Sequence, residues 1–156
     1  ERFGETAQLL AAHNIDFNRR SMPRPEVKPV LLLDSLGELV QAYALASFVF
    51  VGATLVDIGG HNPLEPAAYG KPVIFGPYTG NVRDAVGALL ERGGGFEVRA
   101  APQLAQTIVR LCRDKQLCRQ SGEAAQSVWR ENIGATSRVI KVLGHYLNDA
   151  SEGSEI

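Results

Sequence analysis

The chain has 156 residues, of which 45% are hydrophobic and 21% are charged, as is ordinary for a globular protein. This length suits one domain with a substantial core, and a formal net charge of −1 excludes a broad basic surface for nucleic acid or anionic lipid. No apolar stretch approaches the ~20 residues of a membrane-spanning helix, and the first residues lack the pattern of a signal peptide.

The hydrophobic pattern alternates between helical and extended segments. It predicts helices over 2–13, 35–46, 63–69, 81–92, 102–113, 115–131 and 134–148, and extended segments or strands over 16–20, 30–33, 48–51, 71–75 and 96–98. The first helix is expected to bury Leu9, Leu10 and Ala12. Apolar strands that alternate with helices predict an α/β fold with a parallel sheet flanked by helices. This domain is expected to span 1–149, with a frayed tail over 150–156.

Three loops follow predicted strands directly, over residues 34–39, 52–65 and 76–81. In a parallel sheet the carboxyl ends of the strands share one edge, and ligands bind beyond that edge. The sequence therefore predicts that these loops converge on a binding site.

The loop that ends in Gly59–Glu65 carries the most specific pattern. Gly59 and Gly60 allow close approach of the backbone to a ligand, Asn62 can cap the following helix, and Pro63 suits its first turn. The N–H groups of that turn predict an anion site. Glu65 is placed to accept hydrogen bonds from sugar hydroxyls, as the acidic residue of a dinucleotide site does.

A purely structural interpretation of the same residues stays open. Asn62 and Glu65 also have the spacing of a capping box, in which the carboxylate turns back to the Asn62 N–H. His61 can likewise serve a ligand or only its own loop.

The loop over 34–39 offers a second helix start. Ser35 and Glu38 have capping-box spacing, which predicts a helix from Ser35 to Ala46. Gly37 would then lie in the first turn, at a cost of up to ~1 kcal/mol relative to alanine. Either a ligand approaches the backbone there, or the glycine is incidental.

Four segments together resemble the motifs of one enzyme family. The 3-deoxy-D-manno-octulosonic acid (Kdo) transferases, which move Kdo from CMP-Kdo onto lipid A precursors, have similar residues in the same order as Asp34–Leu39, Gly59–Ala68, Gly70–Val73 and Gly76–Asn81. The resemblance extends over nearly the whole chain, from Glu1 to about Leu147.

The chain departs from the family pattern at a few positions. It has Gly52-Ala53-Thr54 where the family usually has Gly-Gly-Ser, and Tyr78 and Gly80 where the family usually has His and Phe. These departures leave the residues of the expected nucleotide site unchanged.

The resemblance implies a Rossmann-like fold, as in the C-terminal, donor-binding domain of a two-domain GT-B glycosyltransferase, here as a fragment that lacks its first strands. It implies that Gly37, Glu38 and Leu39 lie against the cytidine part of the donor. It further implies that Asn62, Pro63, Leu64 and Glu65 contact the CMP, with Glu65 on the ribose hydroxyls. Gly59, Gly60 and His61 are the candidates of the preceding loop, where His61 would donate to the phosphate or the carboxylate of the donor.

The same resemblance places the general base in an N-terminal domain, so no catalytic residue is expected here and the fragment alone is expected to be inactive. Its expected partners are CMP-Kdo, the lipid A precursor and the N-terminal domain. Membrane contact at the cytoplasmic face of the inner membrane is expected through that missing part, while the fragment itself is expected to be soluble. No cofactor, metal or nucleic acid is expected, and Cys112 and Cys118 are expected to be reduced thiols without metal-ligand spacing.

Two other functions fit the residues. A GT-B transferase or an epimerase that uses a UDP-sugar would share the glycine loop, the helix start and the carboxylate. A non-catalytic α/β interaction domain would keep the fold alone.

Overall fold

The computed structural model describes residues 2–58 and 61–152; for Asn81 and for residues 134–152 it describes the backbone only. The described residues form two compact units, which divide between Ala42 and Tyr43. Among the residues described, none of the helices combines the length and the apolar character that crossing a bilayer requires.

The first unit contains one helix and a small parallel sheet. Its elements are α1 (Phe3–Ala12), β1 (Phe17–Arg19) and β2 (Val30–Leu32), and α2 (Leu39–Leu45) begins in it and ends in the second unit. β1 and β2 run parallel, with Phe17 opposite Val30.

Two expectations for this unit are wrong. No residue of α1 is buried, and Leu9 is 59% exposed, although the helical pattern predicts that it packs inward. Leu31 in the middle of β2 is 60% exposed, so this apolar strand is not covered on both faces within its unit. Two strands of three residues each offer too little surface to bury a helix face and both faces of a strand.

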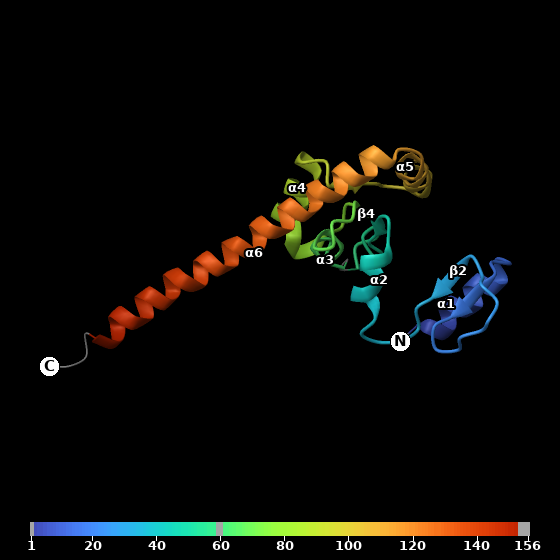
Figure 1. Cartoon of the computed structure of the whole chain (residues 1–156), viewed down its shortest axis with the longest axis horizontal. Helices are drawn as coiled ribbons and strands as arrows, with labels where there is room; N and C mark the ends of the chain where they lie inside the picture. Colours follow the sequence, from blue (N-terminus) through green and yellow to red (C-terminus); the bar gives the residue numbers. More distant parts are fainter. Residues whose placement is uncertain (1, 59–60, 153–156) are drawn as a thin grey trace. The chain divides into compact units, whose positions relative to one another are not determined.

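The second unit contains a three-stranded parallel sheet in the order β3-β4-β5. Figure 1 labels its central strand, β4. Its elements are β3 (Val49–Phe50), α3 (Leu64–Ala67), β4 (Val73–Phe75), the 3₁₀ turn η1 (Gly80–Val82), α4 (Arg83–Glu91), β5 (Gly95–Glu97), α5 (Ala101–Arg113) and α6 (Lys115–Glu152). Alternating parallel strands and helices confirm the predicted α/β class.

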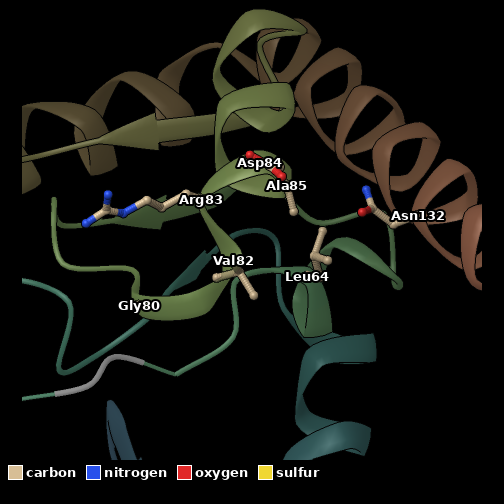
Figure 2. Close-up of a pocket in the computed structure, with 7 residues that line it drawn as sticks. All are labelled: Leu64, Gly80, Val82, Arg83, Asp84, Ala85 and Asn132. Carbon is tan, nitrogen blue, oxygen red and sulfur yellow. The ribbon is translucent and has the colours of Figure 1, made fainter.

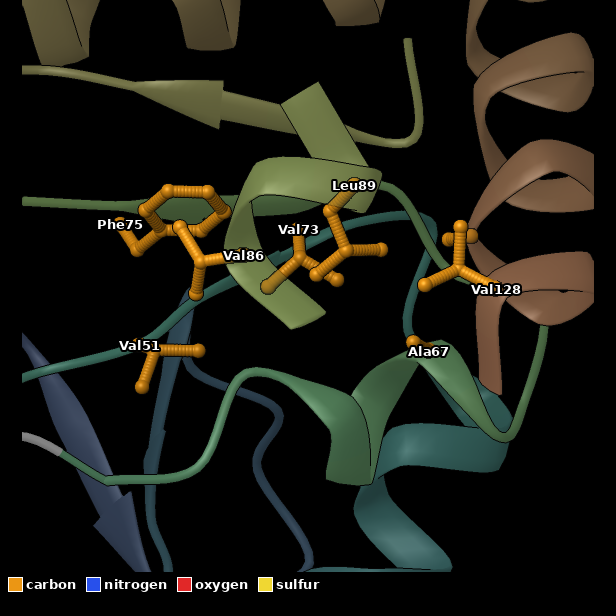
Figure 3. Close-up of a cluster of buried hydrophobic side chains, with 8 residues drawn as sticks. Val51, Ala67, Val73, Phe75, Val86, Leu89 and Val128 are labelled. Atoms are coloured by element: carbon orange, nitrogen blue, oxygen red, sulfur yellow. The ribbon is translucent and has the colours of Figure 1, made fainter. Parts of the chain in front are cut away.

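The central strand β4 holds the core together, because its three residues are fully buried. Val73 and Phe75 face one cluster, which α3, α4 and α6 complete. Figure 3 shows that cluster: its members are Val51, Ala67, Val73, Phe75, Val86, Leu89, Ala125 and Val128. Ile74 faces the other side of the sheet, where it packs with Val98 and Leu111. An apolar strand covered on both faces is thus confirmed for β4.

α6 is one continuous helix of 38 residues, so the predicted break between residues 131 and 134 is wrong. The Asn132 side-chain amide donates to the Val128 carbonyl oxygen (2.9 Å), a bond that lies along the helix instead of ending it. A single glycine at position 134 costs only about 1 kcal/mol in a helix. Packing of the first half of α6 against α3 and α4 outweighs that cost (Figure 1).

Candidate functional site

Thr54 joins the loop after β3 to the loop after β4. Its side chain is fully buried, and its hydroxyl donates to the Val51 carbonyl oxygen (2.6 Å) and accepts the Gly76 N–H (2.8 Å). The Thr54 carbonyl oxygen also accepts the Tyr78 N–H (3.0 Å). Two of the three loops that the sequence expects to converge are therefore in direct contact.

Gly76 must be a glycine for this joint to form. A Cβ at position 76 would overlap the carbonyl oxygen of Thr54, which is main chain and cannot rotate away. Beside it, Ala53 has a φ of 61°, a left-handed conformation that costs a non-glycine residue about 1–2 kcal/mol. The chain thus has an alanine at a strained position in the loop after β3.

Asn62 caps the start of α3, as the sequence predicts. Its Oδ1 accepts the Leu64 N–H (3.0 Å), and its carbonyl oxygen accepts the Glu65 N–H (3.3 Å). These two N–H groups were expected to bind an anion, and in this conformation both bind Asn62 instead. An anion at this place therefore has to be held by other groups, or has to displace the Asn62 side chain.

Glu65 does not form the alternative capping box. Within the described chain the Asn62 N–H has no hydrogen bond to the Glu65 carboxylate. The carboxylate instead lies near the hydroxyl of Tyr43, whose pKa is raised, first by burial and then by Glu65. Tyr43 also packs against Tyr69, with ring centroids 6.3 Å apart. Glu65 is exposed, so the structure leaves its carboxylate open to a ligand.

An open groove of about 640 Å³ lies between α3, the start of α4 and α6. Figure 2 shows the residues around it, which are Leu64, Gly80, Val82, Arg83, Asp84, Ala85 and Asn132. Leu64 and Val82 give it an apolar wall, and Arg83 supplies a cationic side chain at its edge. Arg83 and Asp84 are both exposed, and both line the groove.

A smaller hollow of about 330 Å³ lies next to this groove and shares Leu64 and Asn132 with it. Its lining adds Asn62, Glu65, Trp129 and Ile133. A carboxylate, side-chain amides and an indole ring form the kind of surface that binds the hydroxyls and the apolar face of a sugar. The α6 residues of this wall could not be identified from the sequence, because they lie more than 60 positions after the motif.

The Gly37 segment differs from its prediction. The helix begins at Leu39 instead of Ser35, because Gly37 has a φ of 81°, which a right-handed helix does not admit. Nothing lies within 4 Å of the place where a Cβ would stand, so this φ is what requires glycine. Gly37, Glu38 and Leu39 therefore form a turn that leads into α2, and the predicted glycine in a first helical turn is wrong.

Glu38 is held by side chains instead of capping a helix. Its carboxylate accepts hydrogen bonds from the Ser35 hydroxyl and from Arg20, whose Nη2 lies 2.8 Å away. Both contacts lower the pKa of Glu38, with Ser35 the larger cause. Glu38 is thus ionised and fixed in orientation within the first unit.

A second carboxylate, Asp34, supports the same turn. Its side chain is only 1% exposed, and it accepts the Ser21 N–H (2.8 Å), the Ser21 hydroxyl (2.6 Å) and Arg19 Nε (2.6 Å). The two bonds from Ser21, followed by Arg19, hold the pKa of Asp34 far below its usual value against the opposing effect of burial. This cluster joins the end of β2 to the residues after β1.

The predicted site residues thus fall into two groups. Asn62, Leu64 and Glu65 line one groove system in the second unit, with Pro63 buried beneath them and His61 exposed before them. Gly37, Glu38 and Leu39 belong to the first unit. Gly59 and Gly60 lie outside the described residues. Thr54, Gly76, Arg83, Trp129 and Asn132 were missed, since their link to the motif exists only in the fold.

Among the described residues, no cluster of three or more His, Cys, Asp or Glu side chains is placed to hold a metal ion. Cys112 and Cys118 are free thiols.

The fold is similar to a crystal structure described as the C-terminal CMP-Kdo binding domain of WaaA from Acinetobacter baumannii. The TM-score is 0.76 at 30% sequence identity, over 81% of this chain and 67% of that one. The chain belongs to the Kdo transferase family. The similarity to this crystal structure also confirms the predicted Rossmann-like fold.

Curated members of the Kdo transferase family agree along most of the chain. The 3-deoxy-D-manno-octulosonic acid transferase of Haemophilus influenzae is 39% identical over 151 residues, and that of Bordetella pertussis is 33% identical over 150 residues. Each alignment covers 94% of this chain and 35% of the relative, so the chain spans about a third of the length of these proteins. No protein-family model matches the chain.

Proposed function

We propose that this chain binds CMP-Kdo as the donor-binding part of a Kdo transferase, a glycosyltransferase of lipopolysaccharide biosynthesis. The observation that carries the proposal is the position of Glu65, which is exposed, lines the smaller hollow beside α3 and does not form a capping box. Two findings support the same function: the chain belongs to the Kdo transferase family, and the similar crystal structure is that of a CMP-Kdo binding domain.

In the proposed complex the ribose hydroxyls donate to the Glu65 carboxylate, a charge-assisted contact. Asn62 and the loop before it, with His61, receive the phosphate or the Kdo carboxylate, because the Leu64 and Glu65 N–H groups are already bonded. In the first unit, Arg20 and Ser35 fix Glu38 in the Gly37–Leu39 turn, which the family resemblance assigns to the cytidine. Donors aimed at the leaving phosphate would stabilise the charge that develops as the glycosidic bond breaks.

The remaining steps belong to the longer protein. A general base outside these residues removes a proton from the acceptor hydroxyl of the lipid A precursor. We place this two-domain GT-B enzyme at the cytoplasmic face of the inner membrane, where its acceptor lies. No metal ion or other cofactor enters the proposal.

The test measures nucleotide binding to the 156-residue chain through the fluorescence of Trp129. This residue is the single tryptophan and lines the smaller hollow beside α3. CMP is expected to change this fluorescence, and UDP is expected to have little effect. Glu65→Gln should weaken CMP binding about tenfold or more, since a hydrogen bond to a charged group contributes about 1.5–3 kcal/mol. Glu91→Gln, at the exposed end of α4, is the matched control and should bind as the unchanged chain does.

Other outcomes point to the other functions. A preference for UDP would indicate a UDP-sugar enzyme. No response to any nucleotide, in this chain and in a longer protein that includes it, would leave only an interaction domain. Unchanged CMP affinity of Glu65→Gln with a lowered melting temperature would make Glu65 a structural residue. Transfer from CMP-Kdo in a longer protein, with none in this chain, is the expected division of activity.

A further inference from the structure

A further cavity, separate from the groove and the hollow beside α3, lies in the second unit near the amino ends of β3 and β4. Its volume is about 530 Å³, within the range of ligand-binding pockets. The lining residues are Ala46, Ser47, Phe48, Gly70, Lys71, Leu111, Cys112, Lys115, Cys118 and Arg119. The donor-binding proposal uses none of them.

Three of the lining side chains are cations and none is acidic. Lys71 comes from the turn before β4, and Lys115 and Arg119 come from the first turns of α6. Neither lysine has a salt bridge within the described chain, and Arg119 has only a loose exposed contact with Glu123 at 4.0 Å. Because the whole chain has a net charge of −1, this cluster is a local feature and does not reflect a generally basic protein.

The acidic groups nearby are already engaged or exposed. Asp114 accepts the Leu117 N–H (2.8 Å) and so caps α6, and Glu123 is 72% exposed. The Asp114 carboxylate offsets the positive N-terminal end of α6, so the positive charge of the cavity comes from the three side chains. Three like charges that share a concave surface raise the local concentration of anions.

The walls of the cavity are held firmly in place. Cys118 Sγ donates to the Ser47 carbonyl oxygen (3.4 Å), which joins α6 to the start of β3. Gly122 lies directly on the Gly70 carbonyl oxygen, so that no Cβ would fit between α6 and the turn that carries Lys71. Lys71 and Cys118 line the same cavity. Burial, followed by the neighbouring Cys112, raises the pKa of the Cys118 thiol, and Lys71 opposes this.

We propose that this cavity binds a phosphate group carried by an organic ligand. Lys71, Lys115 and Arg119 neutralise the phosphate, and the partly exposed apolar surface of Ala46 and Phe48 accommodates the rest of the ligand. The phosphate belongs either to a soluble phosphate ester or to the headgroup of a phospholipid, since both present the same chemistry.

Cys112 provides a direct probe, because it lines the cavity and is exposed. In the 156-residue chain we would measure the rate of its alkylation by iodoacetamide, with the modified thiol identified by mass spectrometry. Inorganic phosphate and glycerol 3-phosphate are expected to slow the reaction in a saturable manner, whereas sodium chloride at equal ionic strength should not. Glycerol 3-phosphate is expected to act at lower concentration than inorganic phosphate.

Lys115→Gln and Arg119→Gln should each weaken this protection about tenfold, as expected for loss of one charge-assisted contact. Arg130→Gln is the matched control, since it removes the same charge from the same helix about 16 Å further along its axis. Equal protection in all three variants, or no protection in the unchanged chain, would overturn the proposal.

Sedimentation with vesicles distinguishes the two sources. Binding to phosphatidylglycerol vesicles but not to phosphatidylcholine vesicles, lost in Lys115→Gln and Arg119→Gln, identifies a lipid headgroup. Protection by glycerol 3-phosphate without vesicle binding identifies a soluble ester. Glu65→Gln should leave all these results unchanged, so failure of the donor site and failure of this site are separable.

Discussion

Replacing Thr54 with valine tests whether one buried hydroxyl holds the two loops of the second unit together. Valine has nearly the same shape, so the change removes the hydroxyl without leaving a large cavity. Two hydrogen bonds disappear, of 2.6 Å to the Val51 carbonyl and 2.8 Å from the Gly76 N–H, and both groups remain buried. Lost bonds of about 1 kcal/mol each, plus the penalty for an unpaired buried N–H, give about 2–4 kcal/mol.

The assay is urea unfolding of the chain, followed by the fluorescence of Trp129, which packs against the core of the second unit. Urea unfolding should show a free energy of unfolding that is lower by about 2–4 kcal/mol. In a thermal melt, the same loss corresponds to a fall in the melting temperature of about 5–15 °C in a chain of this size. Thr54→Ser is the control, because it keeps the hydroxyl and loses one methyl group, at about 1 kcal/mol. If the valine variant were as stable as the serine variant, the hydroxyl would not be what joins the loops.

Three further predictions concern backbone strain and charge. Ala53→Gly should raise the stability of the second unit by about 0.5–1 kcal/mol in the same urea assay, because relief of the φ of 61° exceeds the added entropy of the unfolded chain; a loss of stability would contradict the strain. Gly37→Ala should destabilise the first unit by about 1–2 kcal/mol, since the φ of Gly37 is 81°. Faster hydrogen exchange of the Arg20 amide, which donates to the Leu32 carbonyl oxygen, would report the loss. Slower exchange would restore the helical interpretation of this segment. Because the folded state lowers the pKa of Asp34, the contribution of its carboxylate to stability is present at neutral pH and is lost as pH falls below about 4. Asp34→Asn should remove this pH dependence from the hydrogen exchange of the Arg20 amide. A pH profile identical to that of the unchanged chain would exclude Asp34 as the source of the dependence.

Local sequence was sufficient where a short segment satisfies itself. The apolar run Val73–Phe75 predicts a buried parallel strand, and every residue in it is buried between two layers of helices. The spacing of Asn62 and Leu64 predicts a cap, and the bond between them is present. Turns, caps and strand burial involve neighbours in the chain, so pattern and residue type carry the needed information.

Local sequence failed where two conformations satisfy the same residues. The Ser35–Glu38 spacing suits a capping box, yet in the folded chain Arg20, far back in the sequence, holds the Glu38 carboxylate, and Gly37 turns left-handed. α6 likewise continues through Asn132, because packing against α3 and α4 outweighs the weak local signals for a break.

By itself, the sequence determined the α/β class, the family motifs and the carboxylate at Glu65. Only the tertiary structure decided what surrounds them. The hydrogen bond between Thr54 and Gly76 spans 22 positions in the sequence. The groove beside α3 takes its other walls from α4 and α6. The cationic cavity likewise gathers Lys71, Lys115 and Arg119 from separate segments. Such sites depend on distances between segments, and those distances are set by how the helices pack on the sheet, a global balance that no local pattern encodes.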